Sequence, residues 1–256
     1  MSRGASSVNH WNSAALACFR KSVCAKHDPD EMGGKPWGVF SKGLQNVDAT
    51  LLPAGKLKRR EVLNIASDPC VNIETVCLAI MAWGGMWIRS RKLLFNSKNT
   101  EWFRVATEIR AGQLSRQCAY KELRNLRENG ELKGAGPAFF TKLIYFLSPR
   151  SSHGEKPAYI MDQWAGCAVN LLKGDNVVLM DVVKTWQIDK SKPFASSVYR
   201  VSDANTEKNY ENFCKEVDRL AKYFSLNTDE VDRALVGSGG KKPSPWRQYI
   251  INNRVP

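Results

Sequence analysis

A short glycine-containing turn between two stretches of helical character constrains the fold of this chain more than any other feature. Residues 132–137 read Leu-Lys-Gly-Ala-Gly-Pro, after a polar segment at 115–129 and before an apolar segment at 138–147. Glycine has no Cβ, so a chain with glycines two residues apart can turn tightly and bring its backbone close to a ligand. Proline suits the first position of a helix, where its missing N–H costs nothing. The sequence therefore predicts two helices joined as a hairpin over residues 115–147.

This hairpin turn has the chemistry of a phosphate-binding site. Its bare backbone N–H groups can reach a phosphate oxygen, and the second helix directs the positive end of its dipole at the same anion. Such contacts hold a DNA backbone without reading its base sequence. The net charge of +13 also favours a polyanionic partner, because each neutralised phosphate releases a counterion. We therefore expect double-stranded DNA as the partner, with its backbone bound by Lys133, Gly134, Ala135 and Gly136.

The cysteines, histidines and apolar runs indicate where the protein works. Seven cysteines lie at scattered positions without a Cys-x-x-Cys pair, which argues against a disulfide framework and a structural zinc site. The three histidines, His10, His27 and His153, are far apart, so no transition metal is expected. No apolar run reaches the length of a membrane span, and the N-terminus has no apolar signal core. We expect a reduced, cytoplasmic protein that associates with the nucleoid and not with a membrane.

Helical periodicity dominates the rest of the chain, and candidate strands are few. The sequence Trp-Gly-Gly-Met-Trp at 83–87 predicts a break in a helical stretch, because paired glycines kink or end a helix. Residues 28–48 are expected to form a loop and residues 191–203 to be irregular, whereas 176–183 fit either a strand or a helix. The basic cluster at 56–60 fits a solvated surface and a DNA-facing surface equally well. The predicted fold class is mainly α.

Asp162 follows the hairpin after an apolar helix and a loop, and it is predicted to begin the helix at 162–172 as its N-cap. The ordered set of a helix, a Gly-x-Gly-Pro turn, an apolar helix and a helix-capping aspartate resembles the helix-hairpin-helix DNA glycosylase superfamily. The similarity is greatest to the fold of the 8-oxoguanine DNA glycosylases (OGG). The strong part of the resemblance covers residues 115–172.

The resemblance implies a mainly α, helix-hairpin-helix glycosylase fold in which residues 1–256 form a single unit. Two helical subdomains are expected, with the active-site cleft between them. Residues 60–172, approximately, would form a helical core that contains the hairpin. Residues 1–59 and 173–256, again approximately, would pack together as the second subdomain.

Base excision is the chemistry that the resemblance implies, and Asp162 is the candidate catalytic residue. A duplex hides the glycosidic bond, so the enzyme must extrude the nucleotide into a pocket. Breaking this bond leaves positive charge on the sugar, which a nearby carboxylate stabilises. An aspartate at a helix start is often only an N-cap, but in this superfamily the capping and catalytic roles coincide.

The nucleophilic lysine of bifunctional members, two residues after the second hairpin glycine, is absent, since Ala138 stands at that position. Lys142 lies one turn further on the same helix face and is the candidate for Schiff-base and strand-cleaving chemistry. A lysine there can equally contact phosphate or extend from the helix edge. We expect a monofunctional enzyme in which Asp162 orients a water and an abasic site remains. A bifunctional glycosylase/lyase that uses Lys142 is the alternative.

Aromatic residues close to these segments are candidates for the walls of a base pocket, because an extruded base stacks on aromatic faces. The alternative for each of them is packing in the core. The candidates are Phe139, Phe140, Trp83, Trp87 and Trp164.

Three polar residues beyond the helix break are candidates for filling the hole that an extruded base leaves in the duplex: Arg89, Arg91 and Asn96. The alternative for them is plain surface charge. No cofactor is expected to be required, and no iron–sulfur ligand spacing is present. The resemblance implies a monovalent cation on the hairpin carbonyls.

Two functions of different classes follow from the sequence. The first is a monomeric DNA glycosylase that extrudes and excises a modified base. This base is either an oxidised purine such as 8-oxoguanine, in repair, or a hypermodified base of phage DNA, in antiviral defence. The second function is a DNA-binding module that has kept the hairpin and lost catalysis, which Ala138 favours. A nuclease is disfavoured, because the sequence has no clustered carboxylates with Mg²⁺-binding spacing.

Overall fold

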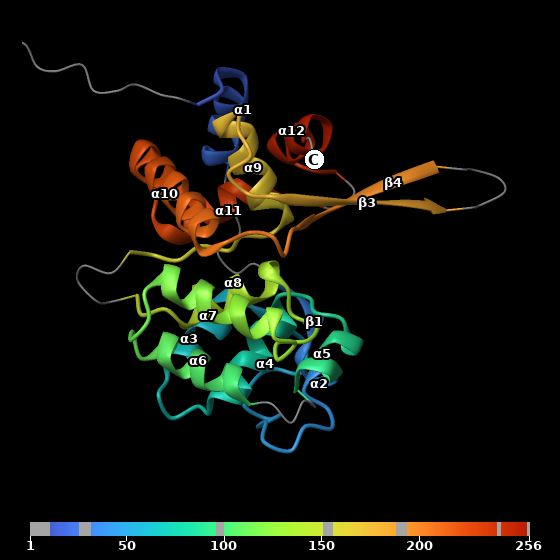
Figure 1. The fold of residues 1–256 in the computed structure, drawn as a ribbon, viewed down its shortest axis with the longest axis vertical. Coiled ribbons are helices and arrows are strands. Elements are labelled where there is room, and N and C mark those ends of the chain that lie inside the picture. The colour runs from blue at the N-terminus through green and yellow to red at the C-terminus, as the bar shows by residue number, and fades with distance from the viewer. Residues whose placement is uncertain are drawn as a thin grey trace, which may run out of the picture.

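The computed structural model describes residues 11–25, 32–95, 100–150, 156–187, 194–239 and 242–254. These residues hold twelve helices and two sheets of two strands each, so the prediction of a mainly α fold is confirmed. They form two lobes, one stacked on the other (Figure 1). We call residues 32–150 the central lobe, and residues 11–25 together with 156–254 the outer lobe. No helix in the described part of the chain combines the length and apolar character that crossing a bilayer requires.

The central lobe contains the predicted hairpin and the helices that support it. Its elements are β1 (Met32–Pro36), α2 (Trp37–Phe40), β2 (Lys56–Lys58), α3 (Arg59–Ser67), α4 (Ile73–Trp83), α5 (Ile88–Phe95), α6 (Glu101–Arg110), α7 (Arg116–Glu128) and α8 (Pro137–Leu147). The outer lobe combines the first helix with the C-terminal part of the chain. Its elements are α1 (Ser13–Val23), α9 (Gln163–Lys173), β3 (Met180–Gln187), β4 (Phe194–Val201), α10 (Glu207–Phe224), α11 (Thr228–Val236) and α12 (Pro245–Asn253).

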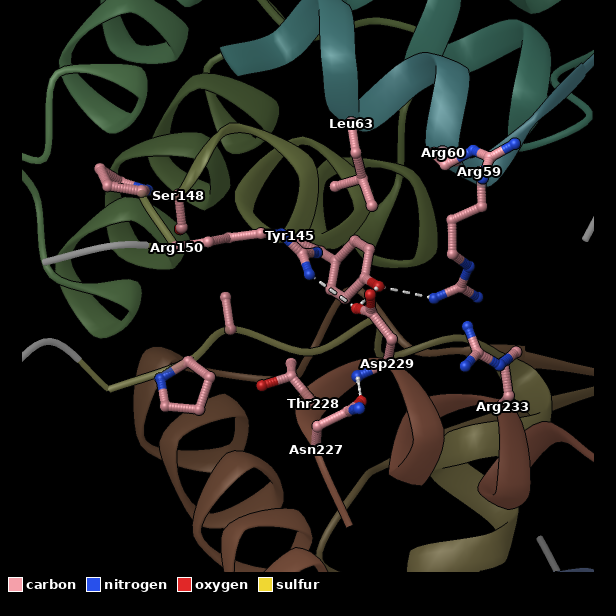
Figure 2. Close-up of a pocket in the computed structure, with 13 residues that line it drawn as sticks. Arg59, Arg60, Leu63, Tyr145, Ser148, Arg150, Asn227, Thr228, Asp229 and Arg233 are labelled. Atoms are coloured by element: carbon pink, nitrogen blue, oxygen red, sulfur yellow. Dashed lines mark hydrogen bonds and ion pairs between the residues drawn. The ribbon is translucent and has the colours of Figure 1, made fainter. Parts of the chain in front are cut away.

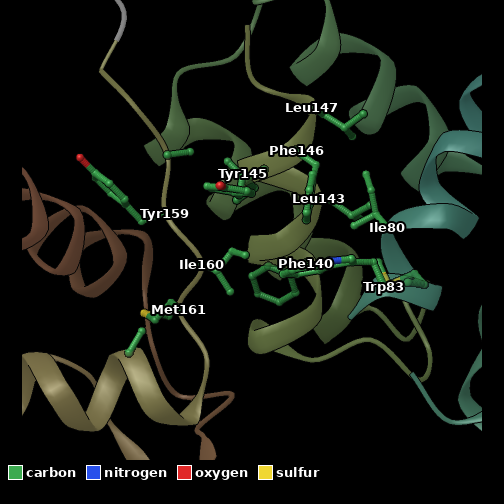
Figure 3. Packing of buried hydrophobic residues seen from close by; sticks show 14 of the residues in the cluster. Ile80, Trp83, Phe140, Leu143, Tyr145, Phe146, Leu147, Tyr159, Ile160 and Met161 are labelled. Carbon is green, nitrogen blue, oxygen red and sulfur yellow. The ribbon is translucent and has the colours of Figure 1, made fainter. Parts of the chain in front are cut away.

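Helix α4 is the centre of the central lobe. Residues 75–83 are all buried, as expected for a helix that is apolar on every side and enclosed by other elements. Asn72 caps it by accepting a hydrogen bond from the backbone N–H of Thr75 at 2.8 Å. Helices α3, α6 and α8 and strands β1 and β2 pack around it. Figure 3 shows the contact of α4 with α8, where the ring centres of Trp83 and Phe146 lie 4.9 Å apart.

The segment at 28–48 is more ordered than the predicted loop. Its described residues include β1, which pairs antiparallel with β2, and the short helix α2. A Cβ built on Gly33 would lie 2.6 Å from the Cα of Trp83, and one on Gly34 would lie 2.5 Å from the Cα of Gly85. These glycines therefore allow two backbones to pack closely, which is a different use from marking a turn.

The prediction that residues 191–203 are irregular is wrong, because residues 194–201 form β4. Strand β4 pairs with β3 in antiparallel register from Met180↔Val201 to Gln187↔Phe194. Of the segment at 176–183, only residues 180–183 belong to a strand, because β3 begins at Met180. A strand takes its hydrogen bonds from a partner outside its own sequence window, so local composition predicts it poorly. The resulting ribbon projects from the outer lobe (Figure 1).

The division into lobes differs from the expected subdomains. Residues 32–58 pack against α4 in the central lobe, and in the described N-terminal segment only α1 packs on α11 and α12. Helix α9, which was expected to end the core, packs on α1, α10, α11 and α12. The boundary therefore falls between α8 and α9, before residue 172.

Candidate DNA-binding and active site

The turn between α7 and α8 exposes part of its backbone, because Lys133 is exposed and Gly134 and Gly136 are partly exposed, but Ala135 is fully buried. Gly130 and Gly134 both have the left-handed conformation, with φ of +75° and +86°. Gly136 is the N-cap of α8 and Pro137 is its first residue, as the sequence predicts. The backbone N–H groups of residues 133–136 donate no hydrogen bond to the described residues. The groups of Lys133, Gly134 and Gly136 can therefore bind an anion, as a phosphate-binding turn requires, whereas burial excludes Ala135 from the binding role expected for it.

This turn lies against α5. A Cβ built on Gly134 would stand 2.6 Å from the carbonyl oxygen of Ser90. Both the positive φ and the lack of space therefore require glycine at this position. The contact places the start of α5, with Arg89 in its first turn and Trp87 just before the helix, beside the backbone of the α7–α8 turn.

The other glycine of the turn, Gly136, is less restricted. Its φ is −89°, and a Cβ built there would lie 3.6 Å from Asp203 Oδ1, an ordinary contact. Two hydrogen bonds from Arg127 of α7, of 2.9 and 2.8 Å, hold this aspartate beside the turn. The carbonyl groups of residues 133–135 accept no hydrogen bond from the described residues. They fit the monovalent cation that the resemblance implies, since backbone carbonyls can replace water around such an ion.

Asp162 begins α9 as its N-cap. Its Oδ1 accepts hydrogen bonds from the backbone N–H groups of Trp164 and Ala165, at 2.8 and 3.0 Å. Its Oδ2 accepts none from the described residues, so capping uses only one oxygen of the carboxylate. The backbone N–H of Met161 donates to Thr141 Oγ1 of α8 at 3.2 Å. This bond ties the segment before Asp162 to the residue before Lys142.

Lys142 directs its side chain back along α8. Its Nζ donates a hydrogen bond to the carbonyl of Ala138 at 2.7 Å and lies 5.4 Å from the centre of the Phe139 ring. Side chains on helices lean toward the N-terminus, so the ammonium reaches the helix position to which the resemblance assigns the nucleophilic lysine. A Cβ on Gly84 would lie 2.8 Å from Lys142 Cδ. The glycine at the end of α4 therefore makes room for this largely buried side chain.

Two of the aromatic pocket candidates lie beside Lys142. Phe139 is half-buried under its ammonium. Trp83 precedes Gly84 and is buried, with the guanidinium of Arg59 at 4.9 Å from its ring centre.

The other three aromatic candidates do not enclose a pocket. Phe140 is buried and packs edge-on against Tyr120, with ring centres 5.0 Å apart. The ring of Trp164 is covered by the guanidinium of Arg247 at 3.7 Å. Trp87 is 75% exposed. The expected roles of Phe140 and Trp164 as pocket walls are therefore replaced by packing, and Trp87 faces solvent.

Three residues were expected to fill the hole that an extruded base leaves in the duplex. This prediction is wrong for Arg91. It is buried and donates hydrogen bonds to the carbonyls of Phe40 and Lys42, so it secures the end of α2. It shares the inner face of α5 with Leu94, three residues later, which is also buried. Arg89 is exposed. Asn96 lies outside the described residues.

A cavity of about 550 Å³ lies between the lobes, at the end of α8 that is remote from the turn (Figure 2). A cleft between two helical units was expected, but neither Asp162 nor Lys142 lines this cavity. Its charged lining is strongly basic and comprises Arg59, Arg60, Arg150, Arg233 and one acid, Asp229.

A hydrogen-bonded network closes one wall of the cavity and joins the lobes. Arg59 donates to Tyr145 Oη at 2.7 Å and pairs with Asp232 at 2.8 Å, with both members of the pair buried. Tyr145 Oη donates to Asp229 Oδ1 at 2.6 Å, and Arg150 donates to the same oxygen at 2.6 Å. Burial raises the pKa of Tyr145. Burial is also the largest effect on Asp229, but the positive charge of Arg150 and the two hydrogen bonds together outweigh it and lower the pKa of this carboxyl.

The sequence pattern did not predict this network of hydrogen bonds and ion pairs. Arg59 belongs to the basic cluster at 56–60, but it is buried and so has neither of the roles expected for that cluster. The spacing of residues on α3 contained the signal, because Arg59 shares one helix face with Val62 and Ile65, which are also buried. Its partner Asp232 is distant in sequence, and no local pattern predicts the pairing.

In the described part of the chain, no group of three or more His, Cys, Asp or Glu residues is arranged to hold a metal ion. His10, His27 and His153 lie outside the described residues.

A mainly helical fold, a glycine-containing turn between two helices and an aspartate that caps the next helix are features of a class of helical enzymes that act on DNA. A family model described as "Putative 8-oxoguanine DNA glycosylase OGG-like protein" matches residues 38–236, more than three quarters of the chain. The chain therefore belongs to this OGG-like family, whose description implies a DNA glycosylase with DNA as its substrate. The match begins in α2 and ends with α11, so it contains the turn, Lys142 and Asp162. Comparison with curated proteins and with solved structures finds no match.

Proposed function

We propose that this protein is a monofunctional DNA glycosylase in which Asp162 assists hydrolysis of the bond between a modified base and its sugar. The observation that carries the proposal is that the two oxygens of the Asp162 carboxylate differ in their hydrogen bonds. Oδ1 caps α9, and Oδ2 accepts no hydrogen bond from the described residues. Capping fixes the position of the charge, and a fixed negative charge beside the sugar stabilises the oxocarbenium ion as it forms. The uncommitted oxygen can orient the attacking water.

In this proposal the α7–α8 turn is a helix-hairpin-helix that holds the DNA backbone. The N–H groups of Lys133, Gly134 and Gly136 bind a phosphate of the damaged strand. The bond between Met161 and Thr141 then keeps Asp162 at a fixed distance from the helix that leaves this turn. The protein acts as a monomer on double-stranded DNA and extrudes the modified nucleotide.

Two substrate classes remain in the proposal. The family description names 8-oxoguanine, which supports an oxidised purine and a role in repair. Ala138 at the position of the usual lysine separates this chain from the bifunctional enzymes. That departure supports a hypermodified base of phage DNA, with an antiviral role.

A bifunctional enzyme is the second candidate function, because Lys142 Nζ reaches the carbonyl of Ala138. Schiff-base formation needs a neutral amine. Ala138 itself supplies no amine at the position of the usual lysine, which favours the monofunctional reaction.

Duplexes with a single defined lesion, together with modified phage DNA, test the proposal when they are scored for abasic sites with and without alkali. We expect strand breaks only after alkali treatment. Asp162→Asn is the matched variant, because asparagine caps a helix as well as aspartate does but carries no charge. It should bind DNA normally and release base about 10²–10³-fold more slowly.

Three outcomes would replace this function. Base release by Asp162→Asn at the wild-type rate would remove Asp162 from the reaction. Spontaneous strand cleavage, with borohydride trapping that disappears in Lys142→Ala, would establish the bifunctional mechanism. Tight DNA binding without base release from any substrate would support the non-catalytic module.

A further inference from the structure

Trp87 is the most exposed large hydrophobic residue in the described part of the chain, with 75% of its surface accessible. The indole of an ordinary tryptophan is mostly buried, so such exposure is informative. One neighbour is a cation, because Lys35 Nζ lies 5.6 Å from the centre of the ring. A large apolar face flanked by positive charge is suited to a nucleic acid, in which flat bases alternate with phosphates.

The backbone that carries this side chain is firmly held. Gly85 has a φ of +75° and packs against β1. Met86 is fully buried, and its N–H donates to the carbonyl of Met81 at 3.0 Å. The carbonyl of Trp87 itself accepts from the N–H of Arg91 at 2.9 Å, in the first turn of α5. A rigid backbone under an exposed ring limits the conformational entropy that is lost when the ring binds.

Two contacts place Trp87 between the two parts of the proposed site. Three residues before it, Gly84 lies against the side chain of Lys142. Three residues after it, Ser90 lies against Gly134 of the α7–α8 turn. The exposed ring therefore projects from the short segment that connects the phosphate-binding backbone with the candidate catalytic lysine.

We propose that Trp87 is the wedge that enters the duplex and stacks in the space left by the extruded nucleotide. This inference rests on the proposed function, because it takes damaged DNA as the partner. An extruded nucleotide leaves a gap one base thick, which an indole ring can fill by stacking on the neighbouring bases. The exposed cation Arg89 lies next to the wedge and is placed to neutralise a phosphate beside the gap.

Affinity for a duplex with a stable tetrahydrofuran abasic-site analogue, compared with the same undamaged duplex, tests the wedge. Wild-type protein should prefer the abasic duplex. Trp87→Ala should lose about tenfold to a hundredfold in affinity for the abasic duplex and stay within about twofold of wild type on the undamaged one. Trp87→Phe should retain most of the preference, because a phenyl ring still stacks.

Tyr223→Ala is the matched control, since it removes an exposed aromatic ring from a different element, α10. It should leave both affinities unchanged. Equal loss on both duplexes in Trp87→Ala would overturn the wedge in favour of an ordinary backbone contact. No change on either duplex would overturn it in favour of a surface for a protein partner.

A second readout is the fluorescence of 2-aminopurine placed opposite the abasic analogue. Wild-type protein and Tyr223→Ala should quench it when the indole stacks, and Trp87→Ala should not. Because the analogue carries no base to excise, both readouts work even if no base release is found. Failure of the wedge and failure of the proposed glycosylase are therefore distinguishable.

Discussion

Gly134 and Gly136 are two residues apart in one turn, but the structure restricts them in different ways. Gly134 has a positive φ and almost no space for a Cβ, because of the Ser90 carbonyl. Gly136 has an ordinary φ and ordinary contacts. The first glycine is therefore required by the fold, whereas the second is required only if an anion must approach the backbone closely.

This difference predicts opposite results for two alanine variants. Gly134→Ala should lower the free energy of unfolding by about 1–3 kcal/mol, because φ and the clash act together. Gly136→Ala should stay within about 1 kcal/mol of wild type and weaken DNA binding at least about tenfold, because its Cβ blocks the phosphate. Urea unfolding and fluorescence anisotropy measure the two quantities. A stable Gly134→Ala, or normal DNA binding by Gly136→Ala, would contradict this account.

At the scale of elements, local signals predict the helices and their starts. Asp162 could be identified from the sequence because an N-cap and the following apolar helix lie in one short window. Strand β4 and the role of Arg59 could not, because each depends on a partner outside its own window. The exposure of Trp87 could not be predicted either, because the sequence shows an aromatic residue but not whether the fold leaves its side chain at the surface.

The pairing of α3 with α11 is an element-scale contact that a double-mutant cycle can test. Arg59 and Asp232 are both buried, and removing one partner leaves an uncompensated charge. Arg59→Ala and Asp232→Ala should each lower the free energy of unfolding by about 3–5 kcal/mol. The double variant should lose clearly less than the sum, because neither charge remains alone.

Arg104→Ala is the control for this cycle, because Arg104 pairs with Glu101 and Glu108 on the exposed face of α6. It should cost no more than about 1 kcal/mol. Urea unfolding monitored by tryptophan fluorescence gives all four values. Additive losses in the double variant would show that Arg59 and Asp232 stabilise the fold independently.

At the scale of the whole molecule, buried and partly buried contacts of charged residues join the lobes. Arg116 of α7 pairs with Glu211 at 2.8 Å and with Asp218 at 2.9 Å on α10. The network around Tyr145 connects α8 to Asp229 of α11. Because these partners are ionisable, the stability of the contact between the lobes depends on pH. Apolar packing alone would not give such a dependence.

The pKa of Asp229 determines whether the stability rises or falls with pH. Its pKa is lowered in the folded protein, because the charge of Arg150 and the hydrogen bonds from Tyr145 and Arg150 outweigh the opposing effect of burial. A carboxyl whose pKa falls on folding stabilises the fold above its unfolded pKa near 4, and the stabilisation disappears as the pH falls through the folded value. Asp229→Asn should therefore be less stable than wild type at pH 7, and the difference should shrink between pH 4 and pH 2. The exposed control Asp175→Asn should follow the wild-type curve, and a constant difference for Asp229→Asn across this range would show that its charge does not hold the lobes together.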